Sequence, residues 1–214
     1  MYKKTLTQKI FTAVFALLVM VPFELYAVAY CALRDPVFAM QAFYPDFSSF
    51  RSYPGVVGPE LRDKLNEHLP YETHFNEFGK HTLYVAYDGD RALGIVHART
   101  EKGDWGLDEL VWSFNVDMTV QDFRFQRSRS KWKAEIESPE FKALLQGKGF
   151  HELKALLSMD GMNFVDGSAR LTKGAEGLAA IAVRSALKTM IVTEYVWGQE
   201  LKDLGIVVEG TGVQ

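Results

Sequence analysis

The sequence predicts an α+β fold, with a single N-terminal transmembrane helix followed by one domain that contains an antiparallel sheet and a long C-terminal helix. Three patterns lead to this prediction. A basic start precedes a long apolar run, strand-like segments flank tight turns in the middle of the chain, and an alanine-rich segment with helical periodicity lies near its end. Strands and helices do not alternate along the chain, which excludes a doubly wound parallel sheet.

The composition narrows the classes of partner. Of the 214 residues, 48% are hydrophobic and 24% are charged, as in ordinary globular proteins. The net charge of −3 argues against nucleic acid, which favours a basic protein surface. Cys31 is the only cysteine, so the sequence excludes an intrachain disulfide framework and an iron–sulfur cluster held by its own cysteines.

Residues 1–33 are expected to form a cytoplasmic end and a membrane anchor. Three lysines precede an apolar run from Ile10 to Leu33, which is long enough for a helix to cross the hydrocarbon core. The positive-inside rule then leaves the N-terminus in the cytoplasm and the following domain in the periplasm, at a bacterial inner membrane. The alternative is a signal peptide that is cleaved after Ala27-Val28-Ala29.

Glu24 is the acidic residue within this apolar run. An ionisable group at membrane depth is costly and marks a buried contact, so larger membrane-protein subunits are expected to pack against this helix, with lipids around it. If the apolar span ends earlier, Glu24 only reaches the membrane interface. The sequence leaves both interpretations open.

An aromatic strap or linker is expected over residues 34–58, and the outer domain over residues 59–214. The strap is rich in aromatic residues without regular spacing. Within the domain, Pro59 predicts a helix over Glu60–Leu69. Ser138 and Pro139 form an N-terminal helix signal that predicts a helix near Phe141–Leu145, and a further short helix is expected over His151–Leu157.

Two pairs of segments predict antiparallel strands. Asp88-Gly89-Asp90 lies between His81–Tyr87 and Ala92–Thr100, and this turn sequence predicts a hairpin. Alternating apolar residues from Leu110 to Val116 predict a half-buried strand, which pairs with Val120–Arg127.

The last predicted element is a long helix over Lys173–Trp197. Apolar residues such as Ala179 and Val183 recur at helical spacing along one face. Arg184 and Lys188 are expected on the opposite, exposed face.

Catalytic motifs are absent from the sequence. It contains no phosphate-binding Walker loop, no G-x-S-x-G nucleophile elbow and no H-E-x-x-H zinc motif. His74, Glu77 and His81 lie close together, but their spacing fits neither one helix face nor a known metal-binding turn. No catalytic residues and no metal site are therefore expected.

Three short stretches precede or open the predicted long helix: Ser138-Pro139-Glu140-Phe141, Val165-Asp166, and Gly167 to Thr172. In these stretches the chain resembles the FMN-binding domain of the flavin-carrying subunits of Rnf- and Nqr-type ion pumps. Members of that family have one membrane anchor, an external α+β domain and a D-x-[ST]-G-A-T-x-[ST] motif before an alanine-rich helix. The threonine of that motif esterifies the phosphate of FMN.

The chain departs from this motif at the attachment point. Depending on the alignment, Leu171 or Arg170 falls where the family has its acceptor threonine, so covalent flavin attachment is not expected. The resemblance leaves Ser168, Arg170, Thr172 and Lys173 as candidate residues for holding the FMN phosphate without a covalent bond, at the start of a helix. The alternative is that these residues only cap the helix.

Three functions follow as expectations. The first, favoured by the resemblance together with the missing acceptor, is a non-catalytic accessory subunit of a respiratory or photosynthetic electron-transport complex in the membrane. It would brace larger subunits or dock a soluble redox carrier on the periplasmic side, without a cofactor of its own. The second is a flavoprotein that carries electrons through non-covalently bound FMN. The third is a periplasmic sensor or small-ligand-binding protein.

Overall fold

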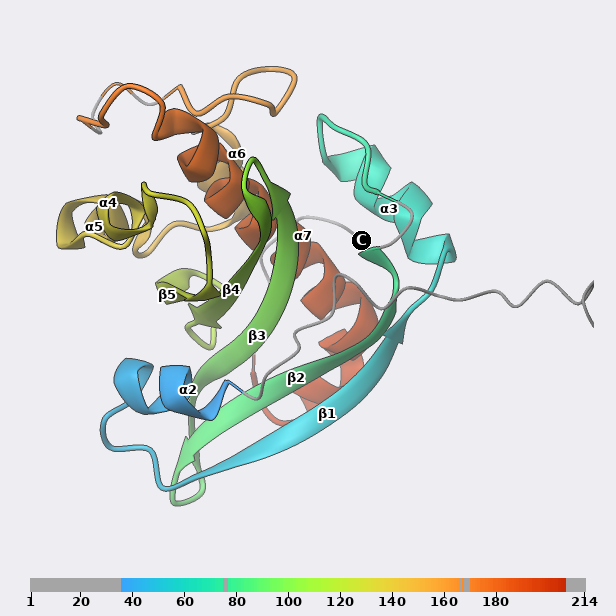
Figure 1. Cartoon of the computed structure of the whole chain (residues 1–214). Helices are drawn as coiled ribbons and strands as arrows, with labels where there is room; N and C mark the ends of the chain where they lie inside the picture. The colour runs from blue at the N-terminus through green and yellow to red at the C-terminus, as the bar shows by residue number, and fades with distance from the viewer. Residues whose placement is uncertain (1–35, 75–76, 166, 168–169, 207–214) are drawn as a thin grey trace, which may run out of the picture.

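The sheet of this protein is an antiparallel meander in which each strand pairs with the next one along the chain. The computed structural model describes residues 36–74, 77–165, 167 and 170–206. The strand order is β1-β2-β3-β4-β5. Helix α7 (Glu176–Asp203) crosses one face of the sheet, and α2 (Val37–Phe43) covers part of the other face (Figure 1). The α+β part of the predicted fold class is therefore confirmed.

The local sequence signals place most elements where they were expected. The strands are β1 (Ser49–Val57), β2 (Gly79–Asp88), β3 (Arg91–Gly103), β4 (Gly106–Phe114) and β5 (Val120–Arg127). Shorter helices are α3 (Glu60–His68), α4 (Lys133–Ile136), α5 (Pro139–Leu145) and α6 (Phe150–Lys154). Gly89 has a φ of 60° in the β2–β3 turn, a conformation that glycine adopts without steric cost. The Ser138 hydroxyl accepts a hydrogen bond from the Phe141 N–H at 3.2 Å, as an N-cap does.

The membrane part of the prediction is wrong for the residues that the structure describes. Within these residues, no helix combines the length and the apolar character needed to cross a membrane. Helix α7 has 28 residues, but Arg184 and Lys188 interrupt its apolar sequence. The predicted span, Ile10–Leu33 with Glu24, lies outside the described residues. For the described residues, the single-pass fold class and the bacterial inner-membrane localisation derived from it are therefore corrected to an α+β domain without a helix of that kind.

Helix α7 is buried over most of its length because the sheet covers one side of it and α3 and α6 contact it as well. On the sheet, Trp112 and Phe114 are fully buried and stacked, with ring centroids 6.1 Å apart. The Trp112 indole N–H donates to the Ser185 hydroxyl of α7 at 3.1 Å. Lys188 was expected on an exposed face, but only 4% of it is exposed. It is buried because two carboxylates surround its ammonium group, as described below.

The segment expected to be a strap contains a helix and a strand. Residues 37–43 form α2, and residues 49–57 form β1, an edge strand. Pro54 and Gly55 are unfavourable in central strands but are tolerated at an edge, which is why the strand was not evident from the sequence. Helix α2 packs over Val96 and Val111, so β4 is buried on both faces and is not half-buried as predicted.

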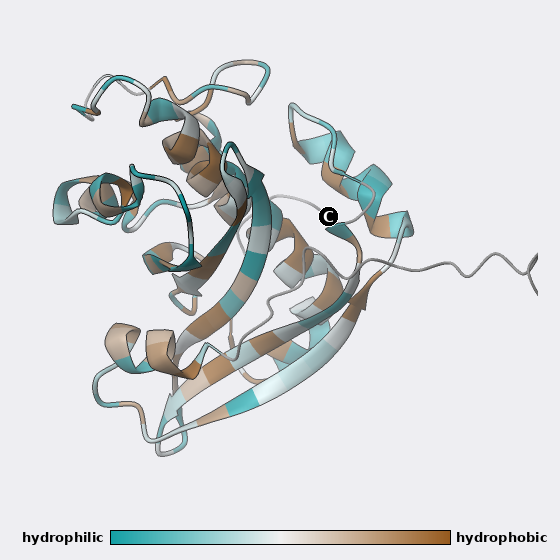
Figure 2. Ribbon diagram, in the orientation of Figure 1, coloured by the Kyte–Doolittle hydropathy of each residue, from teal (hydrophilic) through white to brown (hydrophobic). Residues whose placement is uncertain are grey.

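The sheet divides between β2 and β3. Their ladder runs from Asp88 and Arg91 at the turn to Leu83 and His97, although both strands continue beyond that point. The β1–β2 and β3–β4 ladders have no such early end. Figure 1 shows β2 and β3 separating, and in Figure 2 the same part of β3 changes from hydrophobic to hydrophilic. Charged side chains therefore occupy the region where the two strands part.

Candidate functional site

Four charged side chains form a closed ring between the diverging strands and α7. We call Glu77, Arg99, Glu101 and Lys188 the ionic ring. Arg99 donates from Nη2 to Glu77 Oε2 at 2.6 Å and from Nε to Glu101 Oε1 at 3.2 Å. Lys188 Nζ lies 2.7 Å from Glu77 Oε2 and 2.5 Å from Glu101 Oε2. Each cation thus bridges both carboxylates, and the four formal charges cancel.

Two members of the ring, Glu77 and Arg99, keep their charges although they are buried. Burial favours the neutral acid at Glu77, but Lys188 and Arg99 outweigh this effect and lower the pKa of Glu77 to about 2. Burial also opposes the charge on Arg99, yet Glu77 and Glu101 raise its pKa above the ordinary value. Glu77 and Arg99 therefore stay charged at neutral pH.

Two histidines lie against the ring on β2 and β3. His97 Nε2 is 3.4 Å from His81 Nδ1, and His97 Nδ1 is 3.3 Å from the Thr193 hydroxyl of α7. Burial, together with the nearby charge of Arg99, lowers the pKa of His81 to about 4. Burial, His81 and Arg99 lower the pKa of His97 well below its usual value. Both imidazoles are therefore neutral at pH 7.

The ionic ring is suited to holding the fold together and not to reacting with a substrate. Each of its four residues is at most 6% exposed, so a substrate cannot reach the ring without opening the interior. Among the described residues, no group of three or more histidine, cysteine, aspartate or glutamate side chains could hold a metal ion. A site that a ligand can reach must therefore lie in another part of the molecule.

A hollow of about 730 Å³ lies beside α5 and the segment that leads into α7. We call it the α5 hollow. Its apolar lining comes mainly from Phe141, Leu144 and Leu171. Ser138 and Arg170 add polar groups, and Glu135 and Glu140 add carboxylates. Its volume is within the range of small-molecule sites in proteins. An apolar lining with few polar groups can hold a flat aromatic ligand that ends in an anionic group.

The structure places the predicted FMN-phosphate residues as follows. Arg170 is exposed and lines the α5 hollow. Thr172 and Lys173 are also exposed, but neither is among the lining residues. The Thr172 backbone N–H donates to Glu135 Oε1 at 2.5 Å, so a carboxylate already occupies this donor. Ser168 lies outside the described residues. The structure thus brings Arg170 into the same site as Ser138 and Phe141, two residues on which the resemblance rests.

The sequence contained a signal for the ionic ring that the prediction did not use. His97, Arg99 and Glu101 alternate along β3 and share a face with the fully buried Ile95. Charged residues at core positions of a strand must find partners, and the partner on α7 is Lys188. Without the position of α7, this partner could not be identified.

Comparisons with known proteins do not assign the chain to a family. No family model matches it, and no curated protein is a significant match.

Proposed function

We propose that the α5 hollow binds flavin mononucleotide, or a closely similar phosphorylated aromatic ligand, without a covalent bond. The observation that carries this proposal is that Arg170 lines one hollow together with Ser138, Glu140 and Phe141, from which it is separated in the sequence. These are stretches in which the chain resembles the FMN-binding domain, and the hollow is large enough for a flavin ring.

The lining supports a specific orientation of the ligand. Leu144 and Leu171 provide apolar surface for the flat ring system, whereas the Phe141 ring is 3% exposed and packs against Phe123 and Phe164. Among the described residues of the lining, Arg170 is the only cation, so the phosphate belongs at its end of the hollow. Glu135 and Glu140 repel an anion elsewhere along the wall. The ligand is held by apolar contacts to its ring system and by one ion pair.

Titration of the purified protein with FMN and with riboflavin tests this proposal. Quenching of flavin fluorescence should show that FMN binds about tenfold or more tightly than riboflavin, because a hydrogen bond to a charged group contributes about 1.5–3 kcal/mol. Arg170→Ala should reduce FMN affinity to that of riboflavin and leave riboflavin binding unchanged.

Arg129→Ala is the matched control, since Arg129 is an exposed arginine outside the lining of the hollow. It should bind FMN as the unchanged protein does. Equal losses in the two variants would show that the effect is one of overall charge. A protein that binds neither flavin contradicts the proposal.

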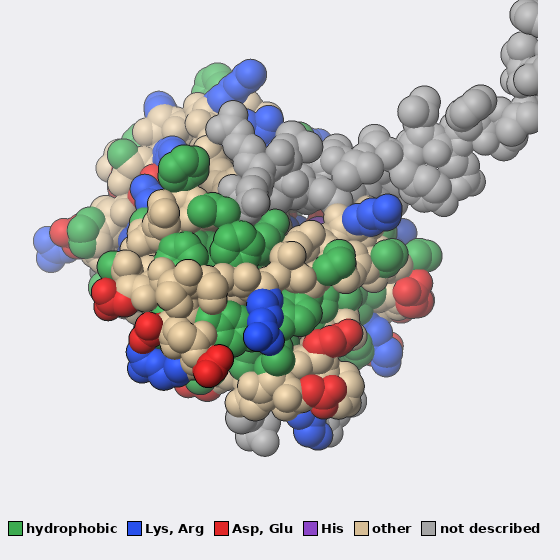
Figure 3. All heavy atoms as spheres, turned by 90° about the horizontal axis from the view of Figure 1, so that it is seen from below, with side chains coloured by type: hydrophobic (Ala, Val, Ile, Leu, Met, Phe, Trp, Pro, Cys, Tyr) green, Lys and Arg blue, Asp and Glu red, His purple; other side chains and the backbone are tan. Residues whose placement is uncertain are grey.

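A second candidate is the non-catalytic accessory role in an electron-transport complex. It is favoured by apolar side chains exposed on the outer side of the sheet. Phe38 of α2 is 85% exposed, and Phe50 of β1 is 38% exposed and packs edge-on against Tyr84. Figure 3, which views the molecule from below, shows hydrophobic side chains gathered on that side. The same titration separates the two candidates, because an accessory domain of this kind needs no flavin.

A further inference from the structure

The turn over residues 158–163 is closed by its own hydrogen bonds. The Ser158 N–H donates to the Asn163 carbonyl at 2.8 Å, and the Asn163 N–H donates to the Ser158 hydroxyl at 3.0 Å. The Asp160 carboxylate accepts from the Met162 N–H at 3.0 Å. These hydrogen bonds stabilise one backbone conformation, which determines the side chains that the turn presents to solvent.

The turn exposes two methionine side chains. Met159 is 97% exposed and Met162 is 51% exposed. The other methionines that the structure describes, Met40, Met118 and Met190, are at most 2% exposed. A thioether is oxidised only where the oxidant can reach its sulfur. Within the described residues, the turn is therefore the place where a thioether is open to a dissolved oxidant.

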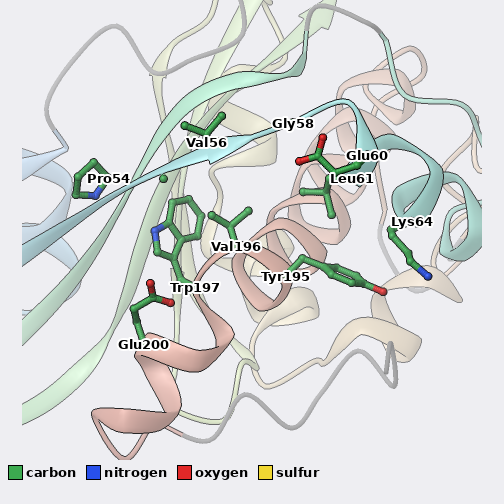
Figure 4. A pocket seen from close by; sticks show the side chains of 11 residues that line it. Pro54, Val56, Gly58, Glu60, Leu61, Lys64, Tyr195, Val196, Trp197 and Glu200 are labelled. Atoms are coloured by element: carbon green, nitrogen blue, oxygen red, sulfur yellow. The ribbon is translucent and has the colours of Figure 1, made fainter.

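The hollows at the surface do not offer a second place of this kind. A hollow of about 560 Å³ lies between β1, α3 and α7, and Figure 4 shows its lining, which includes Leu61, Tyr195 and Trp197. Among the described residues that line this hollow and the α5 hollow, none is a methionine. An oxidant that enters either hollow meets no thioether there.

Met162 differs from Met159 because its sulfur has a hydrogen-bond donor. Arg184 of α7 donates from Nη1 to Met162 Sδ at 3.4 Å. The Arg184 guanidinium also lies over the Tyr71 ring, 5.7 Å from its centre, so it contacts both the ring and the sulfur. A thioether sulfur has two lone pairs, and Arg184 occupies the side of one of them. An oxidant therefore approaches Met162 from the other side, whereas the exposed Met159 is open from both.

We propose that Met159 and Met162 are sites of reversible oxidation by peroxides, and that Arg184 makes the reaction at Met162 stereoselective. The sulfur gives an electron pair to one oxygen of hydrogen peroxide, and the O–O bond breaks. The sulfur is thereby oxidised to a sulfoxide, while the other oxygen takes up the proton and leaves as water. Met162 gives mainly one sulfoxide epimer, and Met159 gives both.

Oxidation replaces the apolar side chains of the turn by polar ones. Two kinds of methionine sulfoxide reductase restore methionine with electrons from thiols, and each acts on one epimer. The epimer formed at Met162 thus decides which reductase can restore it. This modification site is separate from the α5 hollow, because neither methionine lines that hollow.

Treatment of the full chain with hydrogen peroxide, followed by mass spectrometry, tests the proposal. Digestion with a protease that cleaves before aspartate separates Met159 from Met162, since Asp160 lies between them. Both should gain one oxygen atom at least about tenfold faster than the buried methionines. When the oxidised peptides are treated with each reductase separately, each should restore about half of Met159. One reductase should restore at least about threefold more of Met162 than the other, the ratio that one modest hydrogen bond supplies.

Arg184→Ala should remove the preference at Met162, because both sides of the sulfur are then open, and should leave Met159 unchanged. Arg124→Ala is the matched control, since Arg124 is an exposed arginine of β5, and it should keep the preference. Equal amounts of the two epimers at Met162 overturn the proposal, as does an unchanged preference in Arg184→Ala. The proposal is also wrong if the buried methionines are oxidised as fast as Met159, or if the two reductases together cannot restore the undigested chain.

Discussion

At the scale of single residues, the ionic ring is a feature on which single substitutions have a large energetic effect. Each cation contacts two carboxylates, so removing one member leaves a buried charge without compensation. Removing one partner of a buried ion pair is strongly destabilising, because the remaining charge stays buried and cannot regain its hydration. Replacing the whole pair by apolar residues changes the stability much less. The ring is therefore sensitive to single substitutions, whatever its net contribution to stability.

Lys188→Met should lower the free energy of unfolding by about 3–5 kcal/mol, because Glu77 and Glu101 would then share a single cation. Urea unfolding followed by circular dichroism measures this loss. Arg91→Ala is the control, since the pair between Arg91 and Asp88 is exposed, and its loss should cost less than about 1 kcal/mol. Similar losses in both variants would mean that Lys188 is not buried as described.

At the scale of elements, the approach of β1 to α7 depends on one glycine. A Cβ atom at Gly55 would lie 2.6 Å from Val196 Cγ1 and 2.7 Å from Trp197 Cζ2. These contacts are too short, so a larger residue would push β1 away from the helix. The absent side chain allows the strand to lie close over Trp197.

Gly55→Ala should therefore destabilise the protein by about 1–3 kcal/mol, as overpacking does. Gly198→Ala is the opposite case, because no atom lies within 4 Å of its Cβ position and alanine favours the helix by about 1 kcal/mol. Thermal unfolding should show a lower midpoint for the first variant and a higher one for the second. A stabilising Gly55→Ala would contradict the close packing.

The elements also show what the sequence could and could not predict. The β2–β3 hairpin, the Ser138 cap and α7 depend on local signals, and all three were predicted. The buried position of Lys188 depends on what packs against α7, and the strand of residues 49–57 depends on lying at an edge. The α5 hollow is an intermediate case: the sequence indicated Arg170, but only the fold shows that Phe141 and Leu144 face the same space.

At the scale of the whole molecule, stability should depend on pH in one direction. His81 has a pKa of about 4 in the folded protein, against an ordinary value of 6.5, so the unfolded chain binds a proton there first as the pH falls. Glu77, at about 2 against 4.5, acts in the same sense at lower pH. Glu77 favours the folded state at neutral pH and loses this contribution on acidification, whereas His81 disfavours the folded state on acidification because only the unfolded chain then binds its proton.

The free energy of unfolding should fall by about 2–3 kcal/mol between pH 6.5 and pH 4 on account of His81 alone. Urea titrations at a series of pH values measure the slope of the free energy of unfolding against pH. His81→Asn should flatten it in this interval, whereas the same change at the exposed His151 should not. A slope that is the same with and without His81 would contradict its buried, neutral state.

The meander also determines when the interior can close during synthesis. Because each strand pairs with its predecessor, the sheet can assemble while the chain is still leaving the ribosome. Glu77, Arg99 and Glu101 are made early, but Lys188 arrives only with the last long helix. We expect the nascent sheet to expose its inner apolar surface until that helix docks, and a chain truncated before residue 176 to depend on chaperones.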